Sequence, residues 1–550
     1  MISSSFVLVL ALVCILLNAT QATQTTKTNE LTCTLCETVL PLISPLFSLN
    51  VTKEVLIELA IPICIGEEKK AGYPDCNEAT CPYMCNALIH EESVDVLRIL
   101  EKMDLQPNIT CYFLLPQHCP SPSFNPNPTS FIPIRTNLSD HTNEVGPQRW
   151  PSLWALTDGI GTFVHLSDIH VDLEYKNGTV TDCHLPVCCH DGIGTAGLWG
   201  DYACDTPLLL LDSLMDAIAE LSPNFIVYTG DDPDHAIYNQ TREKNLRNIR
   251  IVSERLNERF PSLPIFHAIG NHESFPVNMF GGPGSDSWLL DTLSAEWTPL
   301  LSPSSLLTLR YGGYYTERFN PRLRIIALNT NLFVEENYWL FANFTDIAFQ
   351  LNWLEFILKQ AVTLQEKAVI IGHASCQAWY PLFCTAFDNI LKQYSDVILY
   401  LLFGHTHTTS YVLHYDANDE NPLYVAFLAG SITMINGINP TFRLNTYDIA
   451  SSQLTDYTQF WFDMAVQNNS NNWLSHHYQA SSRYQLDNMS AVSFNELAIR
   501  IQANITTYNN CVDDYVRSSG IWKNGKPTAK ELYCEFTSTT DQQRSQCNNN

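Results

Sequence analysis

The chain of 550 residues is too long for one ordinary hydrophobic core, so we expect two or three domains. Its apolar content of 45% and aromatic content of 11% are typical of a globular protein. The formal net charge of −27 disfavours nucleic acid as a partner, because phosphates are bound by lysine and arginine, and it also disfavours static attraction to anionic membranes at neutral pH.

Residues 1–22 have the features of a secretory signal peptide. Residues 6–17 form an apolar run that is too short to span a bilayer but suits the apolar region of a signal peptide. Small residues follow, so we expect cleavage near Ala22. No later apolar run is long enough for a transmembrane anchor. The protein is therefore predicted to be secreted to the extracellular space or delivered to the lysosome.

Cysteines and glycosylation sequences favour the same compartments. Of the 18 cysteines, Cys14 is removed with the signal peptide, and the remaining 17 cluster at 33–119, 183–204, 376–384 and 511–547. Clustered cysteines behind a signal peptide indicate disulfides, and an odd number leaves one thiol free or paired between chains. The sequences that predict N-glycosylation begin at Asn50, Asn108, Asn137, Asn177, Asn239, Asn343, Asn468, Asn488 and Asn504.

Residues 29–120 are expected to form a small helical domain. Segments 37–49 and 85–103 place apolar residues three and four positions apart. A Cys-x-x-Cys motif opens the domain and two cysteines close it, and these ends resemble the saposin-type family, whose helical hairpin embraces lipid. The resemblance implies contact with a membrane lipid surface and the disulfides Cys33–Cys119, Cys36–Cys111 and Cys64–Cys85, with Cys76–Cys81 as an extra pair. Spacing alone establishes no pairing, and a disulfide-stapled domain that binds nothing is the alternative.

A proline-rich linker at 121–159 separates this domain from an α/β domain at 160–455, in which apolar strand-like runs alternate with helical ones. The expected strands cover 162–168, 224–231, 264–271, 323–330, 367–373, 397–405 and 423–431. The expected helices include 208–221, 241–260 and 347–362. Residues 456–550 are expected to form a small helical C-terminal subdomain, stapled by disulfides among Cys511, Cys534 and Cys547, whose last dozen residues fray.

Five of the expected strands end in side chains that can bind metal ions. These side chains are Asp168, His170, Asp231, Asn271, His373, His405 and His407. Ligands of open α/β sheets gather beyond the carboxyl ends of the strands, so we expect them at one edge. Imidazole together with carboxylate suits Zn²⁺ and neighbouring first-row ions. Polar residues scattered through the core are the alternative, and His373 is the least supported ligand.

Two metal ions account for this set better than one. Asp231 follows a continuous strand and a glycine, and its carboxylate can bridge two cations. The first ion would take Asp168 and His170, and the second would take Asn271 and His373. His405 and His407 project the same way from extended chain, and we expect one imidazole at each ion.

The elements D-x-H, GD, GNHE, GH and GHTH, in this order, resemble the signature of the calcineurin-like metallophosphoesterases. They lie at 168–170, 230–231, 270–273, 372–373 and 404–407. With the saposin-like domain and the linker, the chain resembles the acid sphingomyelinase family. The resemblance implies an α+β sandwich of two sheets flanked by helices, two Zn²⁺ ions, and hydrolysis of sphingomyelin to ceramide and phosphocholine by metal-activated water.

The same resemblance assigns further residues. The sequence GDDPDH places His235 beside the site, where it would stabilise charge or share the role of general acid with His272. Cysteines 183, 188, 189 and 204 fit a disulfide-held loop, and Cys376 is expected to pair locally with Cys384.

The sequence leaves several questions open. Tyr338, Trp379 and Tyr380 are conceivable aromatic faces for choline. A secreted nucleotide or phosphate-ester phosphodiesterase of the same fold is one alternative function, and a lipid-binding protein with an inactive phosphoesterase domain is another. No oligomeric state is predicted.

Overall fold

The computed structural model describes residues 61–62, 82–90, 111–112, 119 and 158–549, except 343–344, 417, 419, 467–472 and 517–524. The signal peptide, most of the saposin-like segment and most of the linker lie outside the described residues. Cys85, Cys111 and Cys119 are disulfide-bonded. Their expected partners Cys64, Cys36 and Cys33 lie outside the described residues, as does the expected pair Cys76–Cys81. None of the helices in the described part has the length and apolarity that a membrane span requires.

The expected glycosylation sites divide in the same way. Asn177, Asn239, Asn488 and Asn504 are exposed, as glycan attachment requires. Asn50, Asn108, Asn137, Asn343 and Asn468 lie outside the described residues.

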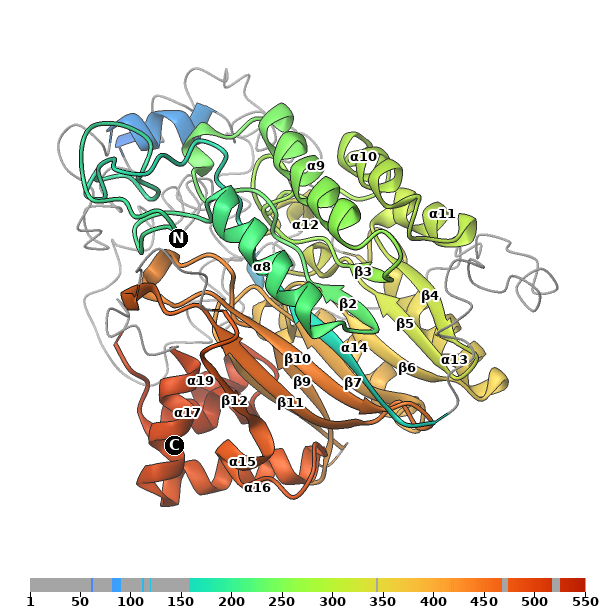
Figure 1. Ribbon diagram of the computed structural model, residues 1–550. Coiled ribbons are helices and arrows are strands. Elements are labelled where there is room, and N and C mark those ends of the chain that lie inside the picture. The colour runs from blue at the N-terminus through green and yellow to red at the C-terminus, as the bar shows by residue number, and fades with distance from the viewer. Residues whose placement is uncertain are drawn as a thin grey trace, which may run out of the picture.

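Two six-stranded sheets pack face to face at the centre of the molecule (Figure 1). The first sheet contains β1 (Ile160–Leu166), β2 (Phe225–Tyr228), β3 (Ile265–His267), β10 (Thr441–Asp448), β11 (Leu454–Trp461) and β12 (His477–Gln479). The second contains β4 (Tyr315–Asn320), β5 (Leu323–Ala327), β6 (Lys367–Ile371), β7 (Ile398–Phe403), β8 (Ser410–Tyr415) and β9 (Pro422–Leu428). Phe163 of β1 stacks on Tyr400 of β7, which joins the two sheets across the core.

In the first sheet the parallel strands lie on one side and the antiparallel strands on the other, whereas the second sheet has parallel strands in the middle and an antiparallel strand at each edge. Strand order is β12-β11-β10-β1-β2-β3 in the first sheet and β4-β5-β6-β7-β9-β8 in the second. β1, β2 and β3 are parallel, as are β5, β6, β7 and β9. The parallel strands therefore point several carboxyl ends toward one end of the sandwich.

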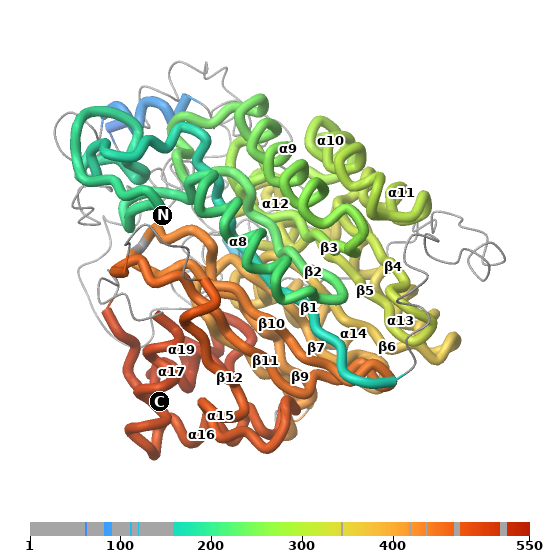
Figure 2. The backbone as a smooth tube through the Cα atoms, viewed as in Figure 1, coloured from blue at the N-terminus to red at the C-terminus, as the bar shows by residue number. Residues whose placement is uncertain are grey.

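Helices flank the two sheets (Figure 2). Those between β1 and β8 are α8 (Leu208–Leu221), α9 (Arg242–Arg259), α10 (Ser287–Trp297), α11 (Pro303–Gly312), α12 (Trp339–Ala342), α13 (Gln350–Leu364) and α14 (Pro381–Gln393). The C-terminal ones are α15 (Ala480–Tyr484), α16 (Ala491–Ala503), α17 (Ile505–Tyr515), α18 (Ala529–Thr537) and α19 (Asp541–Asn549). Short 3-10 turns are η2 (Ile237–Asn239), η3 (Thr330–Leu332), η4 (Cys376–Ala378), η5 (Ile435–Gly437) and η6 (Met464–Val466).

Local chemistry sets the ends of the helices that precede the site. Pro207 comes directly before α8, and the helix stops where Ser222 adopts a left-handed conformation. The side chain of Thr241 accepts a hydrogen bond from the amide of Lys244 and so caps the start of α9. Both helices bury an apolar face against the first sheet, which fixes the loops between strand and helix.

The fold prediction is confirmed for the α/β domain, and all seven expected strands and three expected helices are present. Five strands were not expected, namely β4, β8, β10, β11 and β12. Three of them, β4, β10 and β11, contain several polar residues among the apolar ones, so they lack the continuous apolar runs that marked the parallel strands.

The C-terminal region differs from its prediction. The expected boundary at 455/456 falls inside β11, and α16 and α18 pack on β9 and β8 as part of the main core. The expected fraying of the last dozen residues was wrong, because α19 is tied to α18 by the disulfide Cys534–Cys547 and by ion pairs of Arg544. Cys511 is buried and is the free thiol among the described cysteines.

Candidate metal centre

The structure brings all of the expected ligand residues together at one end of the sandwich, between the two sheets. Asp168 and His170 follow β1, Asp231 follows β2, Asn271 and His272 follow β3, His373 follows β6, and His405 and His407 follow β7. Most of these side chains are buried, although they are polar and come from five separate segments. Such burial of unrelated polar segments at strand ends is typical of a functional site.

Asp231 lies at the middle of the cluster. Its Oδ2 atom is 3.4 Å from His170 Nε2 and 3.2 Å from His373 Nε2. The same carboxylate therefore faces two imidazoles that come from different sheets. This is the arrangement expected of a carboxylate that bridges two cations.

The other side chains form one group on each side of Asp231. Asn271 Oδ1 is 2.8 Å from His373 Nε2 and 3.0 Å from His405 Nδ1. On the other side, Asp168 Oδ1 is 3.4 Å from His407 Nε2. His405 and His407 thus lie in different groups, although both have positive φ angles and not the extended chain from which their positions were predicted.

Outer hydrogen bonds orient the ligand atoms. The Nδ1 atoms of His170 and His373 lie 2.7 Å from the carbonyl oxygens of Pro233 and Thr229, respectively. Because a carbonyl only accepts, each Nδ1 carries the proton and each Nε2 presents its lone pair to the cluster. Asn271 Nδ2 donates to Asn278 Oδ1 at 2.8 Å, which directs its own oxygen inward.

The backbone at the site is held in an unusual conformation. Positive φ angles occur at Asp168 (55°), His170 (46°), Asp231 (68°), His405 (70°) and His407 (60°). Residues other than glycine rarely adopt this conformation, which costs about 1–3 kcal/mol each, and they cluster at functional sites. The surrounding packing therefore holds these five residues where relaxed strands would not place them.

Steric crowding explains why a glycine precedes His405. A side chain at Gly404 would collide with Ser167 and with the carboxylate of Asp168. The glycine therefore lets the end of β7 approach the end of β1.

The donor set fits divalent cations. His170 Nε2 and His407 Nδ1 are buried without a hydrogen-bond partner, and neither Asp168 nor Asp231 is paired with a lysine or arginine in the described part of the chain. Buried carboxylates without cationic partners are costly unless a cation compensates them. Three sets of potential ligands lie within coordinating reach of one another: His170 with His235 and His407, His170 with Asp231 and His272, and Asp231 with His373 and His405. The site is therefore suited to bind divalent metal.

Electrostatics at the centre follows from burial and from neighbouring rings. Burial opposes ionisation of Asp231, but the surrounding imidazoles, His373 first, outweigh it and hold the pKa of this carboxyl well below its usual range. Burial and the neighbouring His373 lower the pKa of His405 to about 4. Asp231 is thus ionised and His405 neutral, which are the states that metal binding requires.

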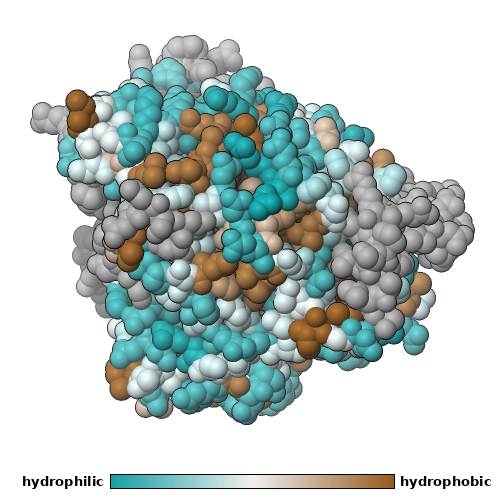
Figure 3. Space-filling model, in the orientation of Figure 1, coloured by the Kyte–Doolittle hydropathy of each residue, from teal (hydrophilic) through white to brown (hydrophobic). Residues whose placement is uncertain are grey.

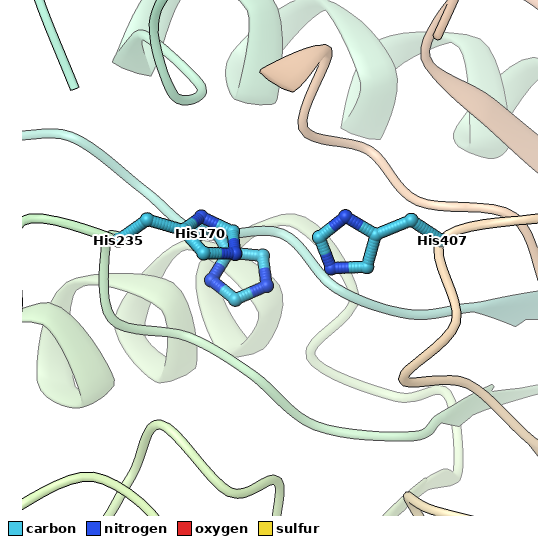
Figure 4. Close-up of side chains that lie close together, drawn as sticks. All are labelled: His170, His235 and His407. Carbon is cyan, nitrogen blue, oxygen red and sulfur yellow. The ribbon is translucent and has the colours of Figure 1, made fainter. Parts of the chain in front are cut away.

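His235 and His272 lie beside the cluster in different environments. Their ring centres are 4.7 Å apart, and those of His170 and His235 are 3.8 Å apart. Figure 4 shows the rings of His170 and His235 beside each other, with His407 facing them. Burial lowers the pKa of His272 well below its usual range. Burial also opposes protonation of His235, but the carboxylate of Asp205 outweighs it and raises the pKa of His235.

Asp205 is a functional residue that sequence reasoning missed. Its Oδ1 atom is 2.9 Å from His235 Nδ1 and accepts a hydrogen bond from Thr433 Oγ1, while its Oδ2 accepts from the amide of His235 at 2.7 Å. The carboxylate therefore fixes both the ring and the backbone of His235. Asp205 lies 30 residues before His235, and no motif in the sequence links them.

Disulfides hold two segments beside the centre. Cys183–Cys188 and Cys189–Cys204 close the loop between His170 and Asp205. Cys376–Cys384 joins η4 to α14 shortly after His373.

The suggested choline contacts were wrong for two aromatic residues. Trp379 is 1% exposed and packs on Phe333 and Phe387, and Tyr380 is 2% exposed. Both rings belong to the hydrophobic core and offer no free face to a ligand.

Comparison with known proteins agrees with this geometry. The family described as calcineurin-like phosphoesterase matches residues 161–409, which contain every residue of the cluster. Sphingomyelin phosphodiesterase A of Dictyostelium discoideum is 27% identical over 88% of this chain and 84% of its own length. Sphingomyelin phosphodiesterase of Homo sapiens is 31% identical over 78% of this chain and 70% of its own length.

A further relative is named for a different substrate. Cyclic GMP-AMP phosphodiesterase SMPDL3A of Rattus norvegicus is 30% identical over 62% of this chain and 80% of its own length. The matches with sphingomyelin phosphodiesterases extend over more of the chain than this one. The chain is a metal-dependent phosphodiesterase by its site and its relatives, and it belongs to the sphingomyelin phosphodiesterase family of calcineurin-like phosphoesterases.

Proposed function

We propose that the protein hydrolyses sphingomyelin to ceramide and phosphocholine at the cluster around Asp231. The observation that carries this proposal is the position of the Asp231 carboxylate between His170 and His373. Further potential ligands lie on each side of it, with Asn271 and His405 on one side and Asp168 and His407 on the other. Two adjacent cation sites can hold a phosphate ester and activate a water molecule for its hydrolysis.

The residues of the cluster would hold two Zn²⁺ ions. Asp168, His170 and His407 would bind one ion, Asn271, His373 and His405 the other, and Asp231 both. Bound metal would supply an activated water molecule and would neutralise charge on the phosphoryl oxygens. Imidazole and carboxylate donors favour zinc or a neighbouring first-row ion over calcium or magnesium.

His272 and His235 would serve the leaving group. The departing alkoxide of ceramide is a strong base and needs a proton as the bond breaks. His272 follows Asn271 directly, and its amide donates to Asp231 Oδ1 at 2.9 Å, which fixes its backbone beside the cluster. The centre of its ring lies 4.8 Å from that of His170. His235 is held by Asp205, which favours its charged form and would let it stabilise the phosphoryl charge or share the proton transfer.

The lipid substrate is favoured over a nucleotide by the extent of the similarity. Two of the matched sphingomyelin phosphodiesterases cover 88% and 78% of this chain, whereas the cyclic GMP-AMP phosphodiesterase covers 62%. The additional part includes residues of the expected saposin-like domain, which would contact a membrane lipid surface. Hydrolysis of a cyclic dinucleotide is the second candidate, because that relative is 30% identical and shares the fold.

The compartment would be lysosomal or extracellular. This is supported by the expected signal peptide and by the four disulfides of the described residues. The exposed asparagines of the glycosylation sequences agree with it. An acidic compartment would also reduce the charge repulsion of a chain with a formal charge of −27.

The test is phosphocholine release from sphingomyelin vesicles by the full-length glycoprotein across pH, with and without chelator, beside a cyclic dinucleotide. We expect hydrolysis of sphingomyelin that is highest at acidic pH and is lost with chelator. Exclusive hydrolysis of the dinucleotide would favour the second candidate, and lipid binding without hydrolysis would indicate an inactive phosphoesterase.

A leaving-group comparison tests the acid role. His272→Ala should slow sphingomyelin hydrolysis by about 10²-fold or more. The same variant should lose far less activity on 4-nitrophenyl phosphocholine, because nitrophenolate leaves without a proton. Retention of the full rate on sphingomyelin would remove His272 from this role, and His235→Ala serves as the parallel variant.

A further inference from the structure

The loop between His170 and Asp205 carries an apolar side chain in an unusual setting. Ile193 is 97% exposed, which is the greatest exposure of any large apolar side chain in the described part of the chain. Leu198, on the same loop, is 41% exposed. Single exposed apolar residues are common on proteins. Ile193 differs because disulfides and backbone hydrogen bonds hold the loop that carries it.

The tip of the loop is rigid. The disulfide Cys183–Cys188 lies on one side of it, and Cys189–Cys204 closes the segment that contains it. Backbone hydrogen bonds join both flanks of Ile193 to residues 178–180: Val180 donates to Asp191 at 3.1 Å, and Gly194 donates to Gly178 at 2.8 Å. The isoleucine therefore cannot fold back onto the protein without breaking these contacts.

The loop also flanks the metal centre. It begins directly after His170 and returns at Asp205, which holds His235. Figures 1 and 2 show it beside the helical residues 82–90, and Val187 of the loop packs with Met84 and Ala236. Tyr83 of that helix is 55% exposed and lies 6.1 Å from Tyr238. In Figure 3 a small hydrophobic group stands out at the edge of the molecule over this loop.

We propose that the loop tip at Ile193 inserts into the headgroup layer of a zwitterionic lipid bilayer and so brings the metal centre to its substrate. The inference rests on the proposed lipid substrate, whose phosphodiester lies in that layer. It adds a membrane contact within the phosphoesterase domain itself, in addition to the saposin-like domain. A rigid apolar tip loses little conformational entropy when it is buried.

The charge of the protein selects the kind of bilayer. The formal charge of the chain is −27, and near Ile193 the exposed side chain of Asp191 is paired with Lys176 at 3.5 Å. An anionic surface would repel the chain as a whole, whereas a zwitterionic one would not. The proposed partner is therefore a bilayer of phosphocholine lipids.

The experiment measures partitioning of the full-length glycoprotein onto phosphatidylcholine vesicles and its rate on sphingomyelin vesicles. Ile193→Ser should weaken partitioning and slow vesicle hydrolysis about tenfold. Ile193→Trp should strengthen partitioning, because an indole ring favours the bilayer interface. Ile505→Ser is the matched control, since Ile505 is 70% exposed on α17, in the C-terminal region. All variants should hydrolyse soluble 4-nitrophenyl phosphocholine at the wild-type rate.

Several outcomes separate this inference from the proposed function. Wild-type partitioning and vesicle rates for Ile193→Ser, or no gain for Ile193→Trp, would overturn the membrane contact while leaving the proposed function intact. Ile193-dependent partitioning without any sphingomyelin hydrolysis by the wild type would support the contact and overturn the proposed function. An equal effect of Ile505→Ser would show that exposed isoleucine acts non-specifically and would also overturn the inference.

Discussion

Buried carboxylates at the two ends of the sandwich have opposite kinds of partners. At the amino end of β6, Glu366 is paired with Arg318 at 2.6 Å and with Arg324 at 2.7 Å. At the carboxyl ends of the strands, Asp231 faces imidazoles instead, and no lysine or arginine pairs with it among the described residues. A carboxylate compensated by two guanidinium groups stabilises the fold. A carboxylate that faces imidazole rings, which can themselves bind metal, is available to a cation, so the difference separates a structural carboxylate from a candidate metal ligand.

Substitution of Asp231 tests the functional end and has the largest expected effect. Asp231→Asn keeps the size of the side chain but removes the charge that two metal ions would share. We expect phosphodiester hydrolysis to fall by at least about 10³-fold, measured as kcat with sphingomyelin vesicles. Thermal unfolding should change far less than activity, because no lysine or arginine among the described residues is left unpaired. A fully active Asp231→Asn variant would contradict the assignment of Asp231 as the shared ligand.

Substitution of Glu366 tests the structural end. Glu366→Gln leaves Arg318 and Arg324 without their carboxylate, one of them almost fully buried, and should lower the free energy of unfolding by about 3–5 kcal/mol. The folded fraction should keep its kcat, so the two variants should show opposite patterns. Denaturant unfolding provides the measurement, and a stability equal to the wild type would show that the pair of arginines is compensated elsewhere.

A third carboxylate, that of Glu335, has neither arginine nor imidazole partners among the groups that shift its pKa; its charged neighbours are acidic. Burial first, and then Glu336 and Asp541, raise the pKa of Glu335 from 4.5 to about 8. Between these values the unfolded chain is ionised and the folded chain is protonated, so stability declines as the pH rises from about 4.5 to about 8. The raised pKa therefore favours the folded state at acidic pH.

Glu335→Gln should remove part of this decline. We expect the variant to match the wild type at pH 4.5 and to be about 1–3 kcal/mol more stable at pH 8, as measured by denaturant midpoints. The same decline in both proteins would mean that other groups carry the pH dependence.

The sequence predicted the site better than it predicted the surroundings of the site. Each ligand stands at the end of an apolar run, and parallel strands bring such ends together, so residues from Asp168 to His407 could be placed at one edge without coordinates. Asp205 could not be found in this way, because its role arises from a hydrogen bond across 30 residues of chain. The left-handed conformation of Asp168 and His405 was equally hidden, since it depends on packing between the sheets.

The limits of the fold prediction have the same physical basis. Apolar runs revealed the buried parallel strands, whereas β10 and β11 contain several polar residues, and part of their core-facing surface is itself polar. Arg443 of β10, for example, is 1% exposed and packs over the ring of Tyr457 at 4.2 Å. A buried arginine in a strand gives no sign in the sequence that it faces inward. The C-terminal helices were separated from the core for the same reason, because their polar composition concealed the apolar face that packs on β8 and β9.

Metal content tests the central claim most directly. Metal analysis of the purified full-length protein, paired with phosphocholine release during stepwise chelation, should give about two divalent ions per wild-type chain and a loss of activity that follows their removal. Asp231→Asn should retain fewer ions. Full activity in a preparation with less than about one ion per chain would contradict the assignment of this cluster as a dinuclear centre.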